Sequence, residues 1–254
     1  MLSWALIGVL IGAVLGLTAA GGAIISVPLF MRFCGATLHE ATAYAAIAVF
    51  TGATMNAWAQ RKRALVKLAV VLGVSAVCGA AFAATFKAQT PEFVIRTMFV
   101  VVCLYGLWAT WNTPPATSQS TESRAATEKR LLKRPWRLVV LGFSLGILVT
   151  MTGMGGGLVV VPILLTRLKI PSTHAIPTTL CVTTLSSLAA LIGQYDVITS
   201  RTTLIPILLL ALGTWVAAAG VSRLSQELPA RKQDRIRKVG LTAVIGFAVV
   251  SVLF

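Results

Sequence analysis

The stretch TMTGMGGG at residues 150–157 interrupts a long apolar run, residues 137–168. The run is about 30 residues long, whereas roughly 20 residues cross a bilayer once. Glycine fills four of the five positions 153–157, and each glycine costs a helix about 1 kcal/mol relative to alanine. In lipid, broken backbone is tolerated only where protein covers it or where it lines a cavity. The stretch is therefore either a packing seam or a binding site.

A weaker copy of this break, TAAGGA at residues 18–23, lies in the first apolar run, residues 3–33. Pro28 follows the first copy as Pro162 follows the second. Three shorter apolar runs follow each broken run: 40–59, 66–86 and 93–111 in the first half, and 175–193, 203–221 and 239–254 in the second. The chain therefore reads as a tandem repeat of one broken element and three ordinary helices.

Composition places the chain in a membrane. Of its 254 residues, 57% are hydrophobic and only 11% are charged, whereas soluble domains carry about a quarter charged residues. The net charge of +15 comes from basic residues between apolar runs, as in cytoplasmic loops of membrane proteins. No nucleic-acid-binding motif accompanies it. We expect the lipid bilayer, and no nucleic acid, as a partner.

The distribution of the 22 Lys and Arg residues indicates that the second break is the tip of a re-entrant hairpin. With eight full spans the basic residues would divide equally between the two sides. If the second broken run returns to its own face, 18 lie on one side, which is the asymmetry of the positive-inside rule. The remainder are Arg32, Lys87, Arg96 and Arg201. The repeat predicts a hairpin in the first half too, although a full span stays open there.

These arguments predict an all-α polytopic membrane protein of two inverted repeats. Each repeat holds one broken, re-entrant helical hairpin and three transmembrane helices, so the two halves cross the membrane in opposite senses. The first repeat covers residues 1–111, a cytoplasmic linker residues 112–136, and the second repeat residues 137–254. The basic loops and the linker face the cytoplasm of a cell membrane crossed several times, and both termini face outward.

The hairpin tips are candidates for binding an anion. The second leg of each hairpin begins at its tip, so a helix N-terminus with unpaired N–H groups and a positive dipole end lies within the membrane. Glycine lets a ligand approach this backbone closely, and two such ends meeting at the midplane form an anion site. In the alternative reading, the glycines only allow close helix packing. The duplication favours the binding site, and we expect a bulky residue at Gly22 or Gly156 to abolish anion binding.

Hydroxyl side chains crowd the helix that follows each break. Such hydroxyls usually bond their own helix, but their number in residues 175–193 exceeds what a core needs. The predicted substrate-binding residues are Thr18, Gly21, Gly22, Ala23, Thr51, Thr152, Gly155, Gly156, Gly157, Thr183 and Ser186. His39 and His174 precede matching helices that Gln60 and Gln194 end. They are either capping residues or gating and proton-site candidates.

No residue pattern indicates catalysis. All seven acidic residues lie in loops or at helix ends, whereas proton and sodium pumps usually keep a carboxylate in mid-span. Metal-ligand clusters and the common catalytic motifs are absent from the sequence. We therefore expect no enzymatic activity, no cofactor and no metal. The sequence leaves open whether the chain forms a homodimer.

The second break, GMGGG at 153–157 with Val161-Pro162 and PSTHA at 171–175, resembles the TauE/SafE sulfite exporters, also called toluene sulfonate uptake permeases. The first copy matches the same pattern more weakly, with Gly21-Gly22, Val27-Pro28 and His39-Glu40-Ala41. The resemblance covers essentially the whole chain. It implies transport of a small sulfur-containing oxyanion such as sulfite, sulfoacetate or another organosulfonate. The family usually shows Gly-Thr-Ser shortly after each histidine, where this chain has PTT at 177–179 and TAY at 42–44.

The sequence thus predicts a secondary transporter that works by alternating access around the two breaks. A membrane potential of 100 mV, inside negative, is worth about 2.3 kcal/mol per charge. Export of an anion is therefore electrically downhill and needs no coupling ion. A passive anion channel is the alternative reading, and a membrane-embedded enzyme or scaffold is a third.

Overall fold

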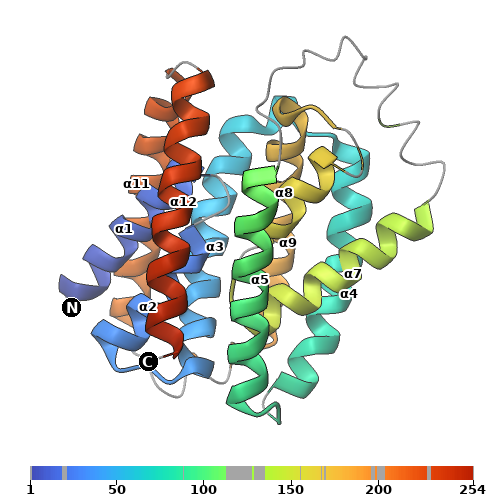
Figure 1. Cartoon of the computed structure of the whole chain (residues 1–254). Coiled ribbons are helices and arrows are strands. Elements are labelled where there is room, and N and C mark those ends of the chain that lie inside the picture. Colours follow the sequence, from blue (N-terminus) through green and yellow to red (C-terminus); the bar gives the residue numbers. More distant parts are fainter. Residues whose placement is uncertain are drawn as a thin grey trace.

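The computed structural model is helical, which confirms the predicted fold class of an all-α polytopic membrane protein (Figure 1). The part of the chain that it describes contains no β-strand. The described residues are 2–18, 22–87, 89–112, 128, 135–154, 156–166, 168, 170–195, 198, 204–227 and 230–253.

The helices follow the predicted apolar runs, and both long runs are split at their glycines. The first half holds α1 (Leu2–Thr18), α2 (Gly22–Cys34), α3 (Leu38–Gln60), the 3-10 turn η1 (Arg61–Arg63), α4 (Val66–Lys87) and α5 (Glu92–Asn112). The second half holds α7 (Pro135–Thr152), α8 (Gly157–Thr166), α9 (Ser172–Ile192), α11 (Leu204–Glu227) and α12 (Ala230–Leu253).

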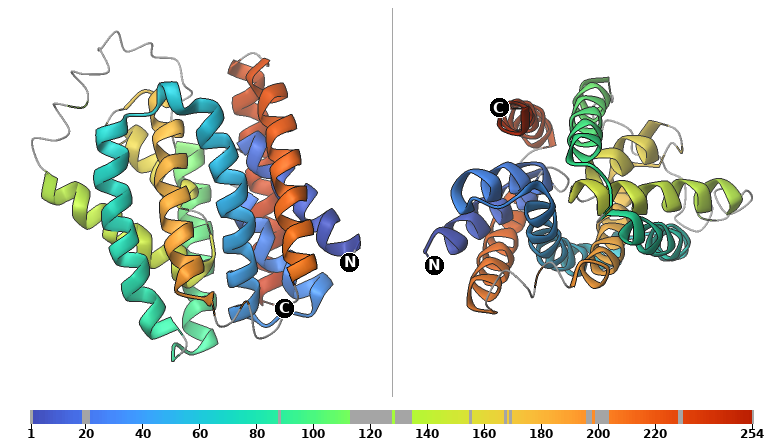
Figure 2. Two further views of the ribbon diagram at one scale, coloured as in Figure 1. Left: turned by 180° about the vertical axis from the view of Figure 1, so that it is seen from behind. Right: turned by 90° about the horizontal axis from the view of Figure 1, so that it is seen from below.

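The two split runs form hairpins that enter the bundle from opposite ends (Figures 1 and 2). The legs α1 and α2 open toward the lower end in Figure 1, where the chain also ends, and α7 and α8 open toward the upper end, where η1 lies. The second half thus has the same order of elements as the first, a hairpin followed by three helices, but it runs through the bundle in the opposite direction. That the halves descend from one duplicated unit stays a prediction.

Each hairpin packs its first leg on a helix of the other half. The right-hand view of Figure 2 shows α1 beside α11 on one side of the molecule and α7 beside α4 on the other. The central helices α3 and α9 also pack against each other. The interlocked halves therefore share their cores, and the boundaries predicted for the two repeats remain untested.

Glycine makes the first hairpin's contact possible. A Cβ atom on Gly8 would lie 2.6 Å from Leu210 O, and one on Gly12 would lie 2.4 Å from Thr214 O. Both neighbours are backbone atoms, so the helices touch along a seam of small residues. The partners advance along α1 and α11 together, so these two helices run in the same direction.

The second hairpin repeats this contact on α4. A Cβ atom on Gly142 would lie 2.6 Å from Leu72 O, and one on Gly146 only 1.9 Å from Ala76 O. The packing-seam reading therefore applies to the first leg of each hairpin. These glycines precede the breaks, so the reading does not account for the glycines at the tips themselves.

Among the described residues, five helices are long and apolar enough to cross a membrane, namely 66–87, 92–112, 135–152, 173–192 and 205–222. Helix α3 is not one of them, because alanine, threonine and the amide of Asn56 lower its hydropathy. Its buried face runs from Leu38 to Asn56, so it packs against protein and needs less apolar surface than a helix in lipid.

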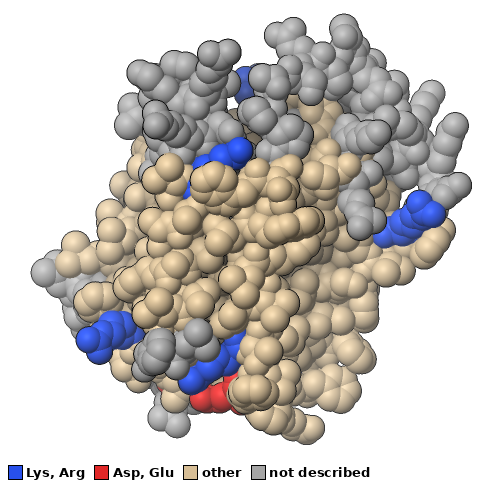
Figure 3. All heavy atoms as spheres, in the orientation of Figure 1, with Lys and Arg blue, Asp and Glu red and all other residues tan. Residues whose placement is uncertain are grey.

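The outer surface has the polarity of a membrane protein. On the face shown in Figure 3, Lys, Arg, Asp and Glu gather toward the two ends, and the band between them is free of these residues. The side chains of Trp58, Trp108, Trp111 and Trp136 are exposed near the ends of their helices. Tryptophans are enriched at such interfaces. These features place the apolar band in the bilayer.

Candidate anion-binding site

The tip of the second hairpin is held by its own side chain and by α3. Thr152 Oγ1 donates to Leu148 O (2.6 Å) and accepts from the N–H of Met154 (3.3 Å). Gly153 has a φ of 67°, a left-handed conformation that favours glycine. A Cβ atom on Gly153 would lie 2.7 Å from the Cα of Thr42. The tip therefore turns at Gly153, in direct contact with the backbone of α3.

The remaining glycines of this break are less constrained. Gly156 and Gly157 are buried, and a Cβ atom on Gly156 would meet only the methyl groups of Val149 and Val160, at 3.3 and 3.4 Å. Gly157 begins α8. The N–H groups of Val159 and Val160 donate to Gly156 O (3.2 and 2.8 Å), which leaves those of Gly157 and Leu158 without acceptors within the helix. Gly155, another predicted binding residue, lies outside the described residues.

The first break is described only by the helices on either side. Helix α1 ends at Thr18 and α2 begins at Gly22, as the glycine pattern predicts. Gly21 lies outside the described residues, and the side chains of Thr18 and Ala23 are not described. The binding role predicted for these residues stays a prediction.

The two breaks do not lie at one level of this bundle. Gly153 abuts Thr42, which is only about 6 Å along α3 from its lower end. The end of α1 lies at the opposite side, because a Cβ atom on Gly16 would be 3.0 Å from the backbone nitrogen of Ser222, near the upper end of α11. The repeat pattern predicts that both breaks meet at the midplane. In this conformation each hairpin reaches most of the way across instead.

Most of the predicted hydroxyl ligands bond their own helix. Thr51 Oγ1 donates to Ile47 O (3.0 Å), and Ser186 Oγ donates to Thr183 O (3.1 Å). Thr152 likewise bonds Leu148 within α7. These three hydroxyls keep lone pairs that can accept a hydrogen bond. Their protons are already donated to backbone carbonyls, so they have none left to donate to an anion.

Unpartnered polar atoms identify the side chains most available to a ligand. Among the described residues, buried side-chain oxygen or nitrogen atoms without a partner belong to Asn56, Thr150, Thr183 and Ser187. All four lie on α3, α7 or α9, three helices that pack against one another. A buried polar group without a partner is costly. The pattern indicates a polar path between the hairpins. Of these four side chains only Thr183 is among the predicted substrate-binding residues, and Ser187 belongs to the hydroxyl-rich stretch 175–193.

The predicted gate residues lie at the two ends of this path. At the upper end, His174 Nδ1 donates to Arg63 O (2.8 Å), and Gln60 ends α3 half-buried. At the lower end, His39 Nε2 donates to Lys87 O (3.3 Å), and its Nδ1 lies 3.8 Å from Glu92 Oε1. Both histidines therefore join helix ends. Whether either also transfers a proton stays untested.

Lys87 is the functional candidate that sequence reasoning missed. Counting loop charges assigned it only to the outer side of the membrane, and the structure buries its side chain, which is 4% exposed. Its Nζ donates to Thr42 Oγ1 (2.7 Å) and to Gln194 Oε1. The ammonium thus joins α3, α4 and α9 at the lower end. The sequence signal was a lysine that directly follows the uncharged apolar stretch 68–86.

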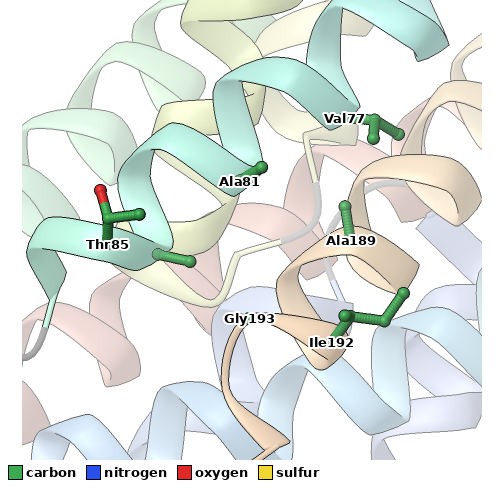
Figure 4. A pocket seen from close by; sticks show the side chains of 7 residues that line it. Val77, Ala81, Thr85, Ala189, Ile192 and Gly193 are labelled. Atoms are coloured by element: carbon green, nitrogen blue, oxygen red, sulfur yellow. The ribbon is translucent and has the colours of Figure 1, made fainter.

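An apolar groove between α4 and α9 is a poorer candidate for an anion site. Its volume is about 380 Å³, and Figure 4 shows small and aliphatic side chains from both helices around it. Thr85, its one hydroxyl, donates to Phe82 O (2.7 Å). The lining residues are Val77, Ala81, Ala84, Thr85, Ala189, Ile192 and Gly193. The groove offers no charge to hold an anion.

Opposed hairpins and an apolar outer band define a multi-pass membrane protein, with buried unpartnered polar atoms on three of its central helices. The profile of the family "Sulfite exporter TauE/SafE" matches residues 4–250, nearly the whole chain. The chain belongs to this family, so it is a transporter of the sulfite-exporter type and not an enzyme. Comparisons with curated proteins and with solved structures found no match.

Proposed function

We propose that this protein carries sulfite or a small organosulfonate such as sulfoacetate out across the cytoplasmic membrane by alternating access. Membership of the sulfite exporter family supports the substrate class. The main support for a substrate path through the bundle is the set of unpartnered polar atoms on α3, α7 and α9. A permeating oxyanion offers several acceptor oxygens to hydroxyl and amide donors that have no protein partner.

The charge pattern favours an anion over a cation. The described carboxylates belong to Glu40, Glu92 and Glu128, all half-buried or exposed, and none lies among the unpartnered atoms of the path. The first turn of α8 adds a positive dipole end beside the tip at Gly153. Neutral hydroxyls together with a helix N-terminus suit an anion.

Closure at both ends of the path suits a carrier. At the upper end, the N–H of Leu65 donates to Thr178 Oγ1 (3.0 Å) and so joins α4 to α9. At the lower end, Lys87 joins α4 to Thr42 and Gln194. An alternating-access transporter would open these contacts one end at a time. A passive channel would need both ends open together.

The orientation follows from charge. The η1 turn at the upper end is Arg61-Lys62-Arg63, and the positive-inside rule assigns such an end to the cytoplasm. An inside-negative potential then drives anions from the upper to the lower end. Export therefore needs no coupling ion.

A thermal-shift screen of the purified protein tests the substrate class. The ligands are sulfite, sulfoacetate, taurine, sulfate and thiosulfate, with chloride as the control. A substrate at a hundred times its Kd stabilises the folded state by about 2.7 kcal/mol, which corresponds to a rise in Tm of about 5–10 °C. If no sulfur oxyanion raises Tm more than chloride does, the proposed substrate class is wrong.

Counterflow in proteoliposomes tests the carrier mechanism. Vesicles loaded with unlabelled substrate should transiently accumulate labelled substrate from outside, with a rate that saturates as its concentration rises. A passive channel would equilibrate the label without this overshoot. Linear, overshoot-free entry would therefore contradict alternating access while leaving the substrate class intact.

A further inference from the structure

The buried ammonium of Lys87 has no counter-charge in the described part of the protein. Its two acceptors, Thr42 Oγ1 and Gln194 Oε1, are neutral. The nearby carboxylate of Glu92 faces His39 instead, 3.8 Å from Nδ1. A buried charge is stable only when it is paired and fully hydrogen-bonded. Lys87 therefore has an electrostatic requirement that its described neighbours do not meet.

Hydrogen-bond capacity remains at this position. An ammonium has three N–H donors, and two of those of Lys87 are used. The amide nitrogen of Gln194 donates one N–H to Ala190 O (3.0 Å), which leaves its second N–H for another acceptor. Thr42 donates its proton to His39 O (2.8 Å) while accepting from Lys87. Within the described part of the chain, the donors left without an acceptor thus come from Lys87 and Gln194, and Thr42 fixes the lysine in place.

Thr42 also connects this cluster to the second hairpin. The backbone of Thr42 lies directly against Gly153 at the tip of the hairpin. The hairpin tip and the Lys87 ammonium therefore both contact Thr42. Gln194 follows the end of α9, the helix that carries the unpartnered hydroxyls of Thr183 and Ser187. The cation therefore lies at the lower end of the polar path.

We propose that Lys87 and Gln194, positioned by Thr42, form an oxyanion-binding site at the outer mouth of the path. The third N–H of Lys87 donates to one oxygen of the anion, and the second N–H of Gln194 donates to another. The ligand is a small oxyanion with at least two charge-bearing oxygens, as in sulfite or a sulfonate. This inference rests on the proposed transport function and assigns a charged residue to it.

Substitution of Lys87 tests the site. Lys87→Met removes the charge and keeps the length of the side chain, whereas Lys87→Arg keeps the charge. The matched control is Arg32→Met, an exposed basic residue at the same end of the bundle. Each purified variant is titrated with sulfite, with Tm as the readout of binding and chloride as the reference anion. Lys87→Met should raise the apparent Kd for sulfite about tenfold or more, because a hydrogen bond from a charged donor is lost. Arg32→Met should match the wild type.

The outcomes separate this inference from the proposed function. If the wild type responds to sulfite and Lys87→Met responds with the same apparent Kd, Lys87 does not bind the anion and the inference is wrong. A Lys87→Met protein with a lower Tm but an unchanged Kd also overturns it, because the lysine then has only a structural role. Should Lys87→Met not fold, Lys87→Gln and Gln194→Leu are judged by the same criterion. If the wild type itself shows neither binding nor transport, the proposed function fails instead.

Discussion

Replacement of Gly153 by alanine should be far more harmful than the same change at Gly156, although both residues belong to one glycine cluster. Gly153 has a φ of 67°, and the left-handed conformation costs an L-residue about 1–2 kcal/mol. Its new Cβ atom would also lie 2.7 and 2.8 Å from the Cα and O of Thr42. These are backbone atoms that cannot rotate away, and overpacking of this kind costs about 1–3 kcal/mol. The expected loss of stability for Gly153→Ala is therefore about 2–5 kcal/mol.

Gly156→Ala is the matched control. Its Cβ atom would meet one methyl group each of Val149 and Val160 at 3.3 and 3.4 Å, which small side-chain shifts can relieve. We expect a change of less than about 1 kcal/mol in either direction. The assay is thermal unfolding of both variants in the same detergent, followed by the Tm shift on adding sulfite. Gly153→Ala should unfold at a lower temperature and lose the sulfite shift, because the tip must move away from Thr42. A Gly153→Ala protein as stable as Gly156→Ala and as responsive to sulfite as the wild type would refute the assigned geometry of the tip.

The same reasoning extends to the packing seam, the polar path and the orientation. Gly146→Ala should lower the free energy of unfolding by at least about 2 kcal/mol, because its Cβ would lie 1.9 Å from Ala76 O. The control Gly246→Ala has open space around its Cβ and should be tolerated in the same unfolding assay. Thr183→Val removes an unpartnered buried hydroxyl, so stability should hold or rise while sulfite counterflow falls about tenfold; Thr184→Val, whose hydroxyl bonds Leu180 O, should leave counterflow unchanged. Equal counterflow in the two threonine variants would exclude Thr183 from the path. A cysteine introduced at Lys62, in a chain without its native cysteines, should react with an impermeant maleimide only after the cells are opened, and labelling of intact cells would reverse the orientation.

The helical architecture was predictable because it depends on local composition. Two overlong apolar runs with glycine breaks predicted the ends of α1 and α7 and the starts of α2 and α8, and the structure has α7 ending at Thr152 and α8 beginning at Gly157. Loop charge predicted that the second break returns to its own face, and the hairpins open at opposite ends (Figure 1). The glycine breaks and the loop charges are both local features of the sequence, so they can be identified without knowing which helices contact one another.

The contacts between distant segments were not predictable in the same way. Gly142 and Gly146 face α4 because of how the two halves interlock, and one sequence does not show which helix a glycine seam will meet. The binding role that the sequence predicts for Gly155, Gly156 and Gly157 stays a prediction, and among the described residues of the break the left-handed conformation belongs to Gly153. The turn at Gly153 lies against Thr42 of α3, a contact that the local sequence does not show.

The buried Lys87 shows that the binding site was also not predictable from local sequence. Charge counting assigns Lys87 to the outer side of the membrane, which stays a prediction, and it does not reveal that the side chain is buried. Its burial comes from Thr42 and Gln194, which belong to different helices and opposite halves. Only the folded bundle brings these three residues together, so no local pattern marks the lysine as a binding residue.

Potential-driven efflux of sulfite from proteoliposomes tests the central claim most directly. Vesicles containing the purified protein and labelled sulfite are given an inside-negative potential with valinomycin and a potassium gradient. A potential of 100 mV is worth about 2.3 kcal/mol per charge, which favours the outside about fiftyfold for each charge moved. We predict efflux that accelerates with the potential and saturates with sulfite concentration. Efflux no faster than from protein-free vesicles at every potential would contradict the assignment of this protein as an exporter of sulfur oxyanions.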